Sequence, residues 1–239
     1  MPDRDRPLYA VLIDADNIPA KYAGAILKEI TSLGEPALRR VYGDWSSGRL
    51  ANWSKTVRDL GLVAHQESAN TVGKNASDIG LVIDAMDILH TGRFDGFVLV
   101  SSDSDFTALA NRVREQGMDV IGIGERKAPE SLRNVCNRFI LIENIMDEPE
   151  QAPARGEPAP RSKKQPPSDA IPLILKAMDK IEQDDEWYAL GQLGQYIIAD
   201  TPDFDTRTYG KRKLSDLVQG LKRFETKKSG NQLVIRRID

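Results

Sequence analysis

The chain has 239 residues, of which 40% are hydrophobic and 29% charged, and its net charge is −3. This length suits one large domain or two modest ones, and the small net charge points neither toward nor away from a nucleic-acid partner. Cys136 is the single cysteine, so no disulfide can form within the chain. Since the N-terminus also lacks a signal-like apolar stretch and no apolar run is long enough to span a bilayer, we expect a cytoplasmic protein without membrane association.

The first 147 residues alternate between short apolar runs and amphipathic segments. Because strands that alternate with helices form right-handed crossovers, this order predicts an α/β domain with a doubly wound, mainly parallel sheet. The expected strands cover residues 8–13, 38–42, 62–65, 97–100, 118–123 and 139–142. The expected helices cover residues 19–33, 48–60, 76–90, 106–116 and 131–136.

Acidic residues follow two of these strands directly. Asp14 ends the first apolar run, and Asp103 and Asp105 follow the run at 97–100. The crevice beyond the carboxyl ends of the strands is where open α/β sheets bind ligands. The alternative for this second pair is that Ser104 or Asp105 only caps the following helix.

The helix expected at residues 76–90 carries a third acidic contribution. On a helical wheel Asp78 lies near the middle of the apolar face, where a carboxylate is costly unless it is paired or bound to a metal. Lys74 stands four residues earlier, so a buried ion pair or cap is the alternative. We expect Asp84, at the edge of the face, and Asp87, outside it, to be solvated or salt-bridged. The face is made of Ile79, Leu81, Val82, Ile83, Ala85, Met86, Ile88 and Leu89.

Carboxylates are the main chemical resource of this sequence. His65, His90 and Cys136 do not have the spacing of a zinc site, and neither a Walker A motif nor a nucleophile elbow is present. If the sheet gathers Asp14, Asp78, Asp103 and Asp105, their mutual repulsion calls for a divalent cation. Ligands that are all oxygen favour Mg²⁺ or Mn²⁺, and such a site suits hydrolysis of a phosphodiester.

A linker and a second domain follow. Residues 148–168 hold six of the thirteen prolines and no aliphatic residue larger than Ala, so we expect a semi-extended linker. Residues 169–239 show three amphipathic helices, at 171–181, 190–198 and 214–221. Residues 224–228 and 233–238, joined by a turn that contains Gly230, are predicted to form a β-hairpin. Three helices and a hairpin are the plan of a winged helix-turn-helix.

The charge of this second domain is unevenly distributed. Residues 169–205 contain nine acids and two bases, whereas residues 206–239 contain ten bases and three acids. A basic helix and wing would suit a phosphate backbone, while the alternative is a solvated surface with internal pairing. Tyr209 and Phe224 lie among the bases and could stack on nucleobases, but for Phe224 we expect core packing instead. The candidate nucleic-acid-binding residues are Lys211, Arg212, Lys213, Lys222, Arg223, Lys227 and Lys228.

Three motifs resemble those of the NYN domain, a family of PIN-like nucleases, over about residues 7–146. They are VLIDADN at 11–17, KNASD at 74–78 and VSSDSDF at 100–106. The resemblance implies a PIN-like, Rossmannoid fold and metal-dependent cleavage of RNA, with a metal held by Asp14, Asp78, Asp103 and Asp105. It also implies supporting roles for Asn17 and Ser102 as polar contacts and for Asp84 as a weaker member. One departure is the serine before Asp103, where many members have glycine, which is expected to alter the turn and leave the carboxylates in place.

The second domain resembles the OST-HTH, or LOTUS, domain. The resemblance lies in WYALGQLG at 187–194, FDTRTYG at 204–210, KLSDL at 213–217 and the closing hairpin. It implies a winged-helix module that binds RNA or a protein partner.

The leading interpretation is therefore an Mg²⁺- or Mn²⁺-dependent ribonuclease with a C-terminal module that binds RNA or a partner. One alternative is a non-catalytic RNA-binding regulatory adaptor. Another is a phosphatase of the haloacid dehalogenase type, because residues 12–16 contain an Asp-x-Asp pattern. That mechanism also needs a later acidic pair, and residues 122–127 supply one acid.

Overall fold

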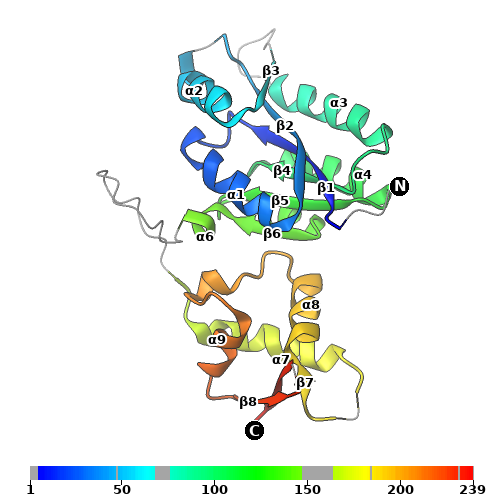
Figure 1. Ribbon diagram of the computed structural model, residues 1–239, viewed down its shortest axis with the longest axis vertical. Coiled ribbons are helices and arrows are strands. Elements are labelled where there is room, and N and C mark those ends of the chain that lie inside the picture. Colours follow the sequence, from blue (N-terminus) through cyan, green and yellow to red (C-terminus); the bar gives the residue numbers. More distant parts are fainter. Residues whose placement is uncertain are drawn as a thin grey trace, which may run out of the picture. The chain divides into compact units, whose positions relative to one another are not determined.

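The computed structural model describes residues 5–46, 48–67, 76–146, 164–183, 185–230 and 232–238. The chain divides into two compact units, residues 1–149 and 150–239 (Figure 1). Lys74 and residues 148–163 of the predicted linker lie outside the described residues. Among the described helices, none combines the length and apolar character needed to cross a membrane.

The first unit contains a six-stranded sheet in the order β3-β2-β1-β4-β5-β6. Every pair of neighbouring strands in it is parallel, which confirms the predicted doubly wound, PIN-like α/β fold. The order reverses direction between β1 and β4, so the centre of the sheet is a topological switch point. The strands are β1 Leu8–Asp14, β2 Glu35–Gly43, β3 Val63–Gln66, β4 Gly96–Val100, β5 Asp119–Gly124 and β6 Arg138–Leu141.

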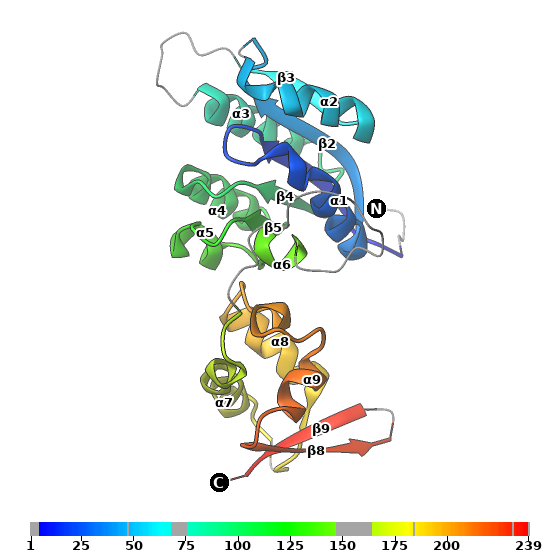
Figure 2. The ribbon, with the colours of Figure 1, turned by 90° about the vertical axis from the view of Figure 1, so that its left-hand side faces the viewer.

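Helices cover both faces of this sheet (Figures 1 and 2). One face packs against α1 Ala23–Leu33, α2 Ala51–Leu60 and α6 Ile142–Met146. The other face packs against α3 Ala76–His90, α4 Thr107–Glu115 and α5 Glu130–Val135. Short 3-10 turns precede three of the helices, at η1 Ala20–Tyr22, η2 Gly48–Leu50 and η3 Ser104–Phe106.

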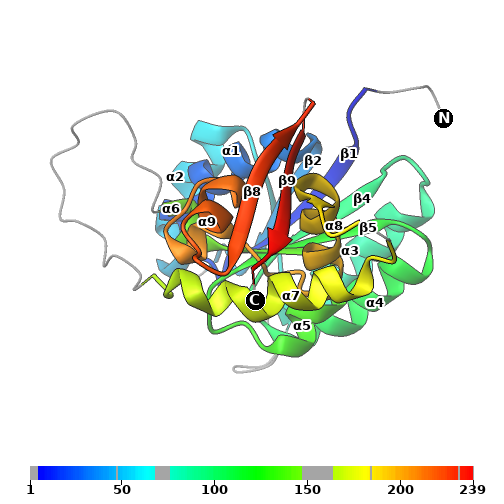
Figure 3. The same cartoon turned by 90° about the horizontal axis from the view of Figure 1, so that it is seen from below.

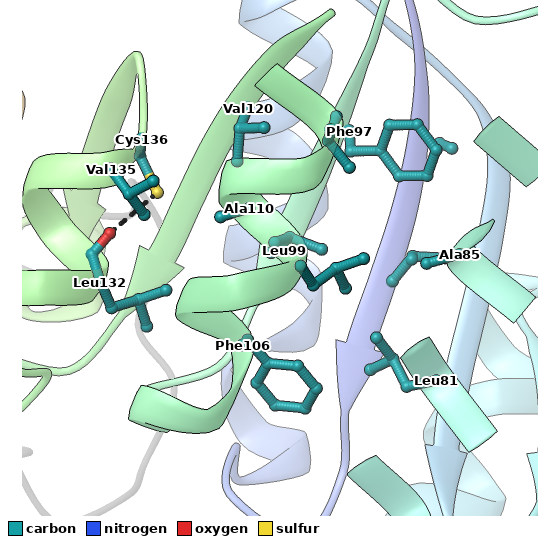
Figure 4. Close-up of a cluster of buried hydrophobic side chains, with 14 of the residues drawn as sticks. Leu81, Ala85, Phe97, Leu99, Phe106, Ala110, Val120, Leu132, Val135 and Cys136 are labelled. Atoms are coloured by element: carbon teal, nitrogen blue, oxygen red, sulfur yellow. Dashed lines mark hydrogen bonds between the residues drawn. The ribbon is translucent and has the colours of Figure 1, made fainter. Parts of the chain in front are cut away.

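The central strands are apolar on both sides because both sides are covered. In β4, Phe97 and Leu99 belong to the cluster beneath α3 and α4, whereas Val98 and Val100 belong to the cluster beneath α1. Figure 4 shows Leu99 between Leu81 and Ala85 of α3 and Ala110 of α4. The short apolar run that the sequence offers is thus a strand buried on both faces.

The apolar face of α3 is narrower than the sequence predicts. Leu81, Ala85 and Ile88 are buried in the core, but Ile79 and Ile83 are 61% and 59% exposed. The prediction for these two isoleucines was wrong, because α3 lies flat on one side of the sheet and buries one stripe only. The helix α6, after β6, was not predicted.

The second unit contains three helices and a three-stranded antiparallel sheet in the order β7-β9-β8. Figure 3 shows β8 and β9 in front of α8 and α9. The last residues of the predicted linker belong to this unit, because the Gln165 amide donates to the Thr208 carbonyl over 2.9 Å. Its elements are η4 Pro167–Ala170, α7 Ile171–Lys180, β7 Tyr188–Ala189, α8 Leu190–Asp200, η5 Thr206–Tyr209, α9 Leu214–Gln219, β8 Phe224–Ser229 and β9 Gln232–Arg237.

Candidate metal centre

Four aspartates reach the carboxyl edge of the parallel sheet from three different elements. Asp14 is the last residue of β1, and Asp103 and Asp105 follow β4. Ile13 pairs with Val100 in the register of these adjacent strands, so both strands end at the same level. Asp78 lies in the first turn of α3. The acids therefore meet at the switch point, where open α/β sheets bind ligands.

The turn after β4 fixes the position of Asp103. Its carboxylate caps η3 by accepting a 3.0 Å hydrogen bond from the Asp105 amide. Its own amide donates to Ser101 Oγ over 3.1 Å. The cap is thus Asp103, and not Ser104 or Asp105 as the alternative interpretation of the sequence had it.

Three of the four acids form a close group, the acidic triad of Asp78, Asp103 and Asp105. Each offers one carboxylate oxygen, and these oxygens lie within 4.8 Å of one another. Asp78 and Asp103 are half-buried and Asp105 is exposed, so the group remains open to solvent. Oxygen ligands with room for water suit Mg²⁺ or Mn²⁺, which keep several water ligands when protein carboxylates bind them. The donor set therefore fits a divalent cation.

The pKa of Asp78 is raised by its burial and by the negative charges around it. Burial and, after it, the charges of Asp14, Asp103, Asp105 and Asp16 raise the pKa of Asp78 to about 6. Each of these causes disfavours the ionised carboxylate. A bound cation would remove that penalty, because it supplies positive charge at the point where the carboxylates converge.

Asp14, the fourth aspartate, lies outside the acidic triad and is buried and hydrogen-bonded. Its side chain is 1% exposed, and its two oxygens accept four hydrogen bonds. Oδ1 accepts from the amides of Asp16 and Asn17 over 3.1 and 3.2 Å. Oδ2 accepts from Asn17 Nδ2 over 2.7 Å and from Ser101 Oγ over 2.8 Å. A carboxylate has about four lone-pair sites, so these donors occupy all of them. Burial raises the pKa of Asp14, and the hydrogen bonds from Ser101 and Asn17 counteract this rise in part.

The supporting residues predicted from the sequence, other than Asp84, are Asn17, Ser102 and Lys74. Asn17 contacts Asp14 through its amide and its side chain. Ser102 Oγ accepts a 2.8 Å hydrogen bond from the Glu125 amide and so ties the end of β4 to the end of β5. Lys74 lies outside the part of the chain that the structure describes.

Asp84 lies in a separate polar cluster between α3 and the edge of the sheet. Its carboxylate pairs with Arg40 and accepts a hydrogen bond from the Tyr42 hydroxyl, both on β2. His65 Nδ1 on β3 is 3.9 Å from the same carboxylate. Burial and the hydrogen bond to Asp84 raise the pKa of Tyr42 strongly. Asp84 is salt-bridged, as the sequence predicts, and it anchors α3 on β2.

Ser101 is the residue of this site that the sequence did not single out. It donates to Asp14 and accepts from the Asp103 amide, so it connects two of the acidic elements. The signal that could have identified it is the register of β1 against β4, which the sequence does not contain. Without the register, Ser101 and Ser102 are equivalent.

The candidate nucleic-acid-binding residues of the second unit lie around α9 and on β8. Six of the seven are exposed and Lys211 is half-buried. Tyr209 and Phe224, in contrast, are 7% and 6% exposed and belong to the core of this unit. The core packing expected for Phe224 is confirmed, and neither ring is accessible for stacking.

Comparisons with known proteins agree with these two units. The NYN domain family matches residues 9–143, and the OST-HTH/LOTUS domain matches residues 162–234. A search of curated proteins found no match.

Solved structures also show similarity to this chain. A protein of unknown function from Vibrio parahaemolyticus is 20% identical with a TM-score of 0.50, over 59% of this chain and 96% of its own. An uncharacterised Nitrosomonas europaea protein is 33% identical over 38% of this chain and 91% of its own, with a TM-score of 0.27. Acinetobacter baumannii MurG is 13% identical over 83% of this chain and 65% of its own, with a TM-score of 0.39. The first of these supports the fold alone.

The family match covers more than half of the chain, and its range contains all four aspartates of the site. The chain therefore belongs to the NYN domain family of the PIN-like nuclease superfamily, and it carries an OST-HTH/LOTUS domain after the NYN domain.

Proposed function

We propose that this protein is a ribonuclease that depends on Mg²⁺ or Mn²⁺ and hydrolyses RNA phosphodiesters. The observation that carries the proposal is the acidic triad, whose three oxygens lie within 4.8 Å of one another at the switch point of the sheet. In this proposal Asp78, Asp103 and Asp105 hold the cation. When bound, the cation supplies activation of the attacking water and stabilisation of the leaving oxygen.

The chain's own residues have distinct parts in this proposal. Asp103 is held by the hydrogen bond that caps η3, so its carboxylate is positioned before a cation binds. Asp14 supports the site by fixing Asn17 and Ser101 through three of its four hydrogen bonds. Direct ligation by Asp14, which the NYN resemblance implies, requires that one of these donors leave.

The second unit, in this proposal, binds the RNA or a protein partner that recruits it. Its exposed bases around α9 and on β8 provide the charge for a phosphate backbone. Because both units are parts of one chain, binding by the second unit raises the effective concentration of RNA at the acidic triad.

The rival function is a non-catalytic RNA-binding adaptor. The observation that favours it is the saturation of Asp14, which leaves three carboxylates in the close group and not four. A phosphatase of the haloacid dehalogenase type has less support, because a covalent mechanism would need Asp14 as an accessible nucleophile and its side chain is 1% exposed.

The test uses the purified full-length protein with end-labelled single-stranded and hairpin RNA, in Mg²⁺, Mn²⁺ or EDTA. Asp103→Asn is the test variant, because an asparagine keeps the cap of η3 and removes the charge. Asp87→Asn is the matched control, since it removes an exposed carboxylate of α3 outside the acidic triad. Metal-dependent cleavage that Asp103→Asn loses and Asp87→Asn keeps supports the ribonuclease. RNA that all three proteins bind and leave intact supports the adaptor.

A further inference from the structure

The second unit contains an aromatic ring that its core does not use. The chain has three tryptophans. The indole N–H groups of Trp45 and Trp53 donate to the carbonyls of His65 and Ile18 over 2.7 and 2.8 Å. Trp187 is half-exposed, and its indole N–H makes no hydrogen bond to another described residue. Trp187 is therefore the tryptophan whose indole N–H group can still bind a partner.

The register of the small sheet places Trp187 on the outer face. Tyr188 pairs with Ile235, which is fully buried beneath the sheet. Since successive residues of a strand point to opposite faces, Trp187 and Arg236 point outward. Lys227 also points outward. It pairs with Val234, which is adjacent to Ile235 in β9 and therefore points to the opposite face. The outer face of the β8–β9 hairpin is turned to the viewer in Figure 3.

Two cations cover the indole ring, and they are held in different ways. The Arg236 guanidinium lies 4.8 Å from the ring centroid and is fixed by a 2.7 Å ion pair with Glu225 and a 3.5 Å pair with Glu186. Lys227 Nζ lies 3.8 Å from the centroid and has no carboxylate within 4.0 Å among the described residues. Arg236 is thus fixed by two ion pairs, whereas no described carboxylate holds Lys227 on the ring, so Lys227 can be displaced.

The backbone around Trp187 is fixed at both ends. Its amide donates to Asp185 Oδ1 over 3.0 Å, and its carbonyl accepts from Gln183 Nε2 over 3.2 Å. A flat ring on a fixed backbone loses little conformational entropy when a ligand stacks on it. Aromatic rings beside mobile cations are the elements with which proteins bind single-stranded nucleic acids.

We propose that Trp187, Lys227 and Arg236 form a stacking site for one nucleobase of single-stranded RNA. The base takes the place of Lys227 on the indole ring, and the displaced ammonium binds a neighbouring phosphate. Arg236 supports the ring throughout, held by Glu225. The proposal rests on the RNA-binding part of the proposed function and adds to it a site that is separate from the basic residues around α9.

The test measures RNA binding by the full-length protein in EDTA, which prevents metal-dependent cleavage. Fluorescent single-stranded RNA is titrated at several salt concentrations with the parent, Trp187→Leu, Trp187→Phe and Lys227→Gln. Tyr196→Leu is the matched control, because Tyr196 is an aromatic residue 37% exposed on α8. Circular dichroism and thermal unfolding of each variant establish that it is folded.

Trp187→Leu is expected to weaken binding about 5- to 150-fold with an unchanged salt dependence, since it removes stacking and no charge. Trp187→Phe keeps a flat ring and is expected to retain most of the affinity. Lys227→Gln is expected to lower the slope of log K against log salt by about 1. Tyr196→Leu is expected to bind like the parent. RNA that contains 5-bromouridine is expected to cross-link to Trp187 under ultraviolet light.

The outcomes separate this proposal from the proposed ribonuclease. If folded Trp187→Leu binds RNA within twofold of the parent and no cross-link maps to Trp187, the stacking site is refuted, whether or not the parent cleaves RNA. A face that binds a protein and not RNA would give that same result. If binding depends on Trp187 but the parent never cleaves RNA, the stacking site stands and the ribonuclease falls. If the parent binds no RNA in EDTA, the stacking site falls, and cleavage of RNA in Mg²⁺ or Mn²⁺ decides the ribonuclease separately.

Discussion

Ser101 Oγ donates a 2.8 Å hydrogen bond to Oδ2 of Asp14 and thereby joins the end of β4 to the end of β1. The same oxygen accepts from the Asp103 amide over 3.1 Å. One hydroxyl therefore links the buried carboxylate beneath the site to the loop that carries Asp103 and Asp105. The arrangement of the acidic triad therefore depends on Ser101, a residue that is not itself a carboxylate ligand.

Ser101→Ala is expected to destabilise the protein and weaken the metal site together. It leaves one lone pair of the buried Asp14 carboxylate and the Asp103 amide without partners, at a cost of about 1–3 kcal/mol. We expect the urea midpoint in EDTA to fall and the Mn²⁺ titration midpoint to rise. Ser32→Ala is the control, because Ser32 is exposed and donates only within α1. An unchanged Mn²⁺ midpoint in a destabilised Ser101→Ala protein would contradict the link.

Because Asp103 caps η3, its structural role as a hydrogen-bond acceptor can be tested separately from its role as a charged ligand. Asp103→Ala removes the acceptor of the Asp105 amide and is expected to cost about 0.5–2 kcal/mol of stability. Asp103→Asn keeps an acceptor and is expected to unfold near the parent's midpoint. Both variants remove a proposed ligand, so both are expected to weaken Mn²⁺ binding by at least about tenfold, the lower end of what loss of a supporting residue costs. Urea unfolding and Mn²⁺ titration distinguish the two effects, and equal destabilisation by Asn and Ala would refute the cap.

The raised pKa of Asp78 predicts a pH dependence of the metal-free protein. Its folded pKa of about 6 lies above the value of about 3.9 for an unfolded Asp. The folded state therefore binds more protons between these values, so the stability from Asp78 is present below about pH 4 and is lost as the pH rises through 6. In EDTA, unfolding curves from pH 4 to 7 are expected to show this loss in the parent. Asp78→Asn lacks the titrating group and is expected to differ from the parent by an amount that changes with pH over this range.

A divalent cation is expected to counteract the loss of stability that the metal-free protein shows as the pH rises. Binding to the ionised triad stabilises the folded state by mass action, and protonation of Asp78 competes with the cation. The increase in Tm upon addition of Mn²⁺ should therefore be larger at pH 7.5 than at pH 5. Differential scanning fluorimetry with and without Mn²⁺ measures this difference, and an increase that is equal at both pH values would contradict a triad that includes Asp78.

The sequence predicted the sheet well because the pattern is local. Each central strand is a run of apolar residues covered on both faces, and each is followed by a helix. Asp14, Asp103 and Asp105 were assigned to strand ends for the same reason, and those positions hold in the structure.

Features that depend on long-range placement were not predictable. Ile79 and Ile83 were assigned to the core because a helical wheel gives a direction but not the width of the contact with the sheet. Ser101 was missed because its partner is 87 residues away in the sequence and is set by strand register. The exposed position of Trp187 depends likewise on the pairing of β7 with β9, and β7, a strand of two residues, was not predicted.

Asp84 is expected to anchor α3 on the sheet and not to bind the metal. Asp84 is 20% exposed and Arg40 27%, so their ion pair is partly shielded from solvent. Asp84→Ala leaves the half-buried guanidinium and the buried Tyr42 hydroxyl without this acceptor, at a cost of about 1–3 kcal/mol. Tyr42→Phe removes one hydrogen bond and is expected to cost about 0.5–1.5 kcal/mol.

The double variant is expected to lose less than the sum of the two single variants, because both changes remove the same hydrogen bond. Since α3 is also held by Leu81, Ala85 and Ile88, we expect it to stay on the sheet and to keep Asp78 in the triad. The Mn²⁺ midpoint of folded Asp84→Ala should then match that of the parent. A tenfold weaker Mn²⁺ midpoint without loss of stability would instead make Asp84 a ligand, and the anchor would be the wrong interpretation.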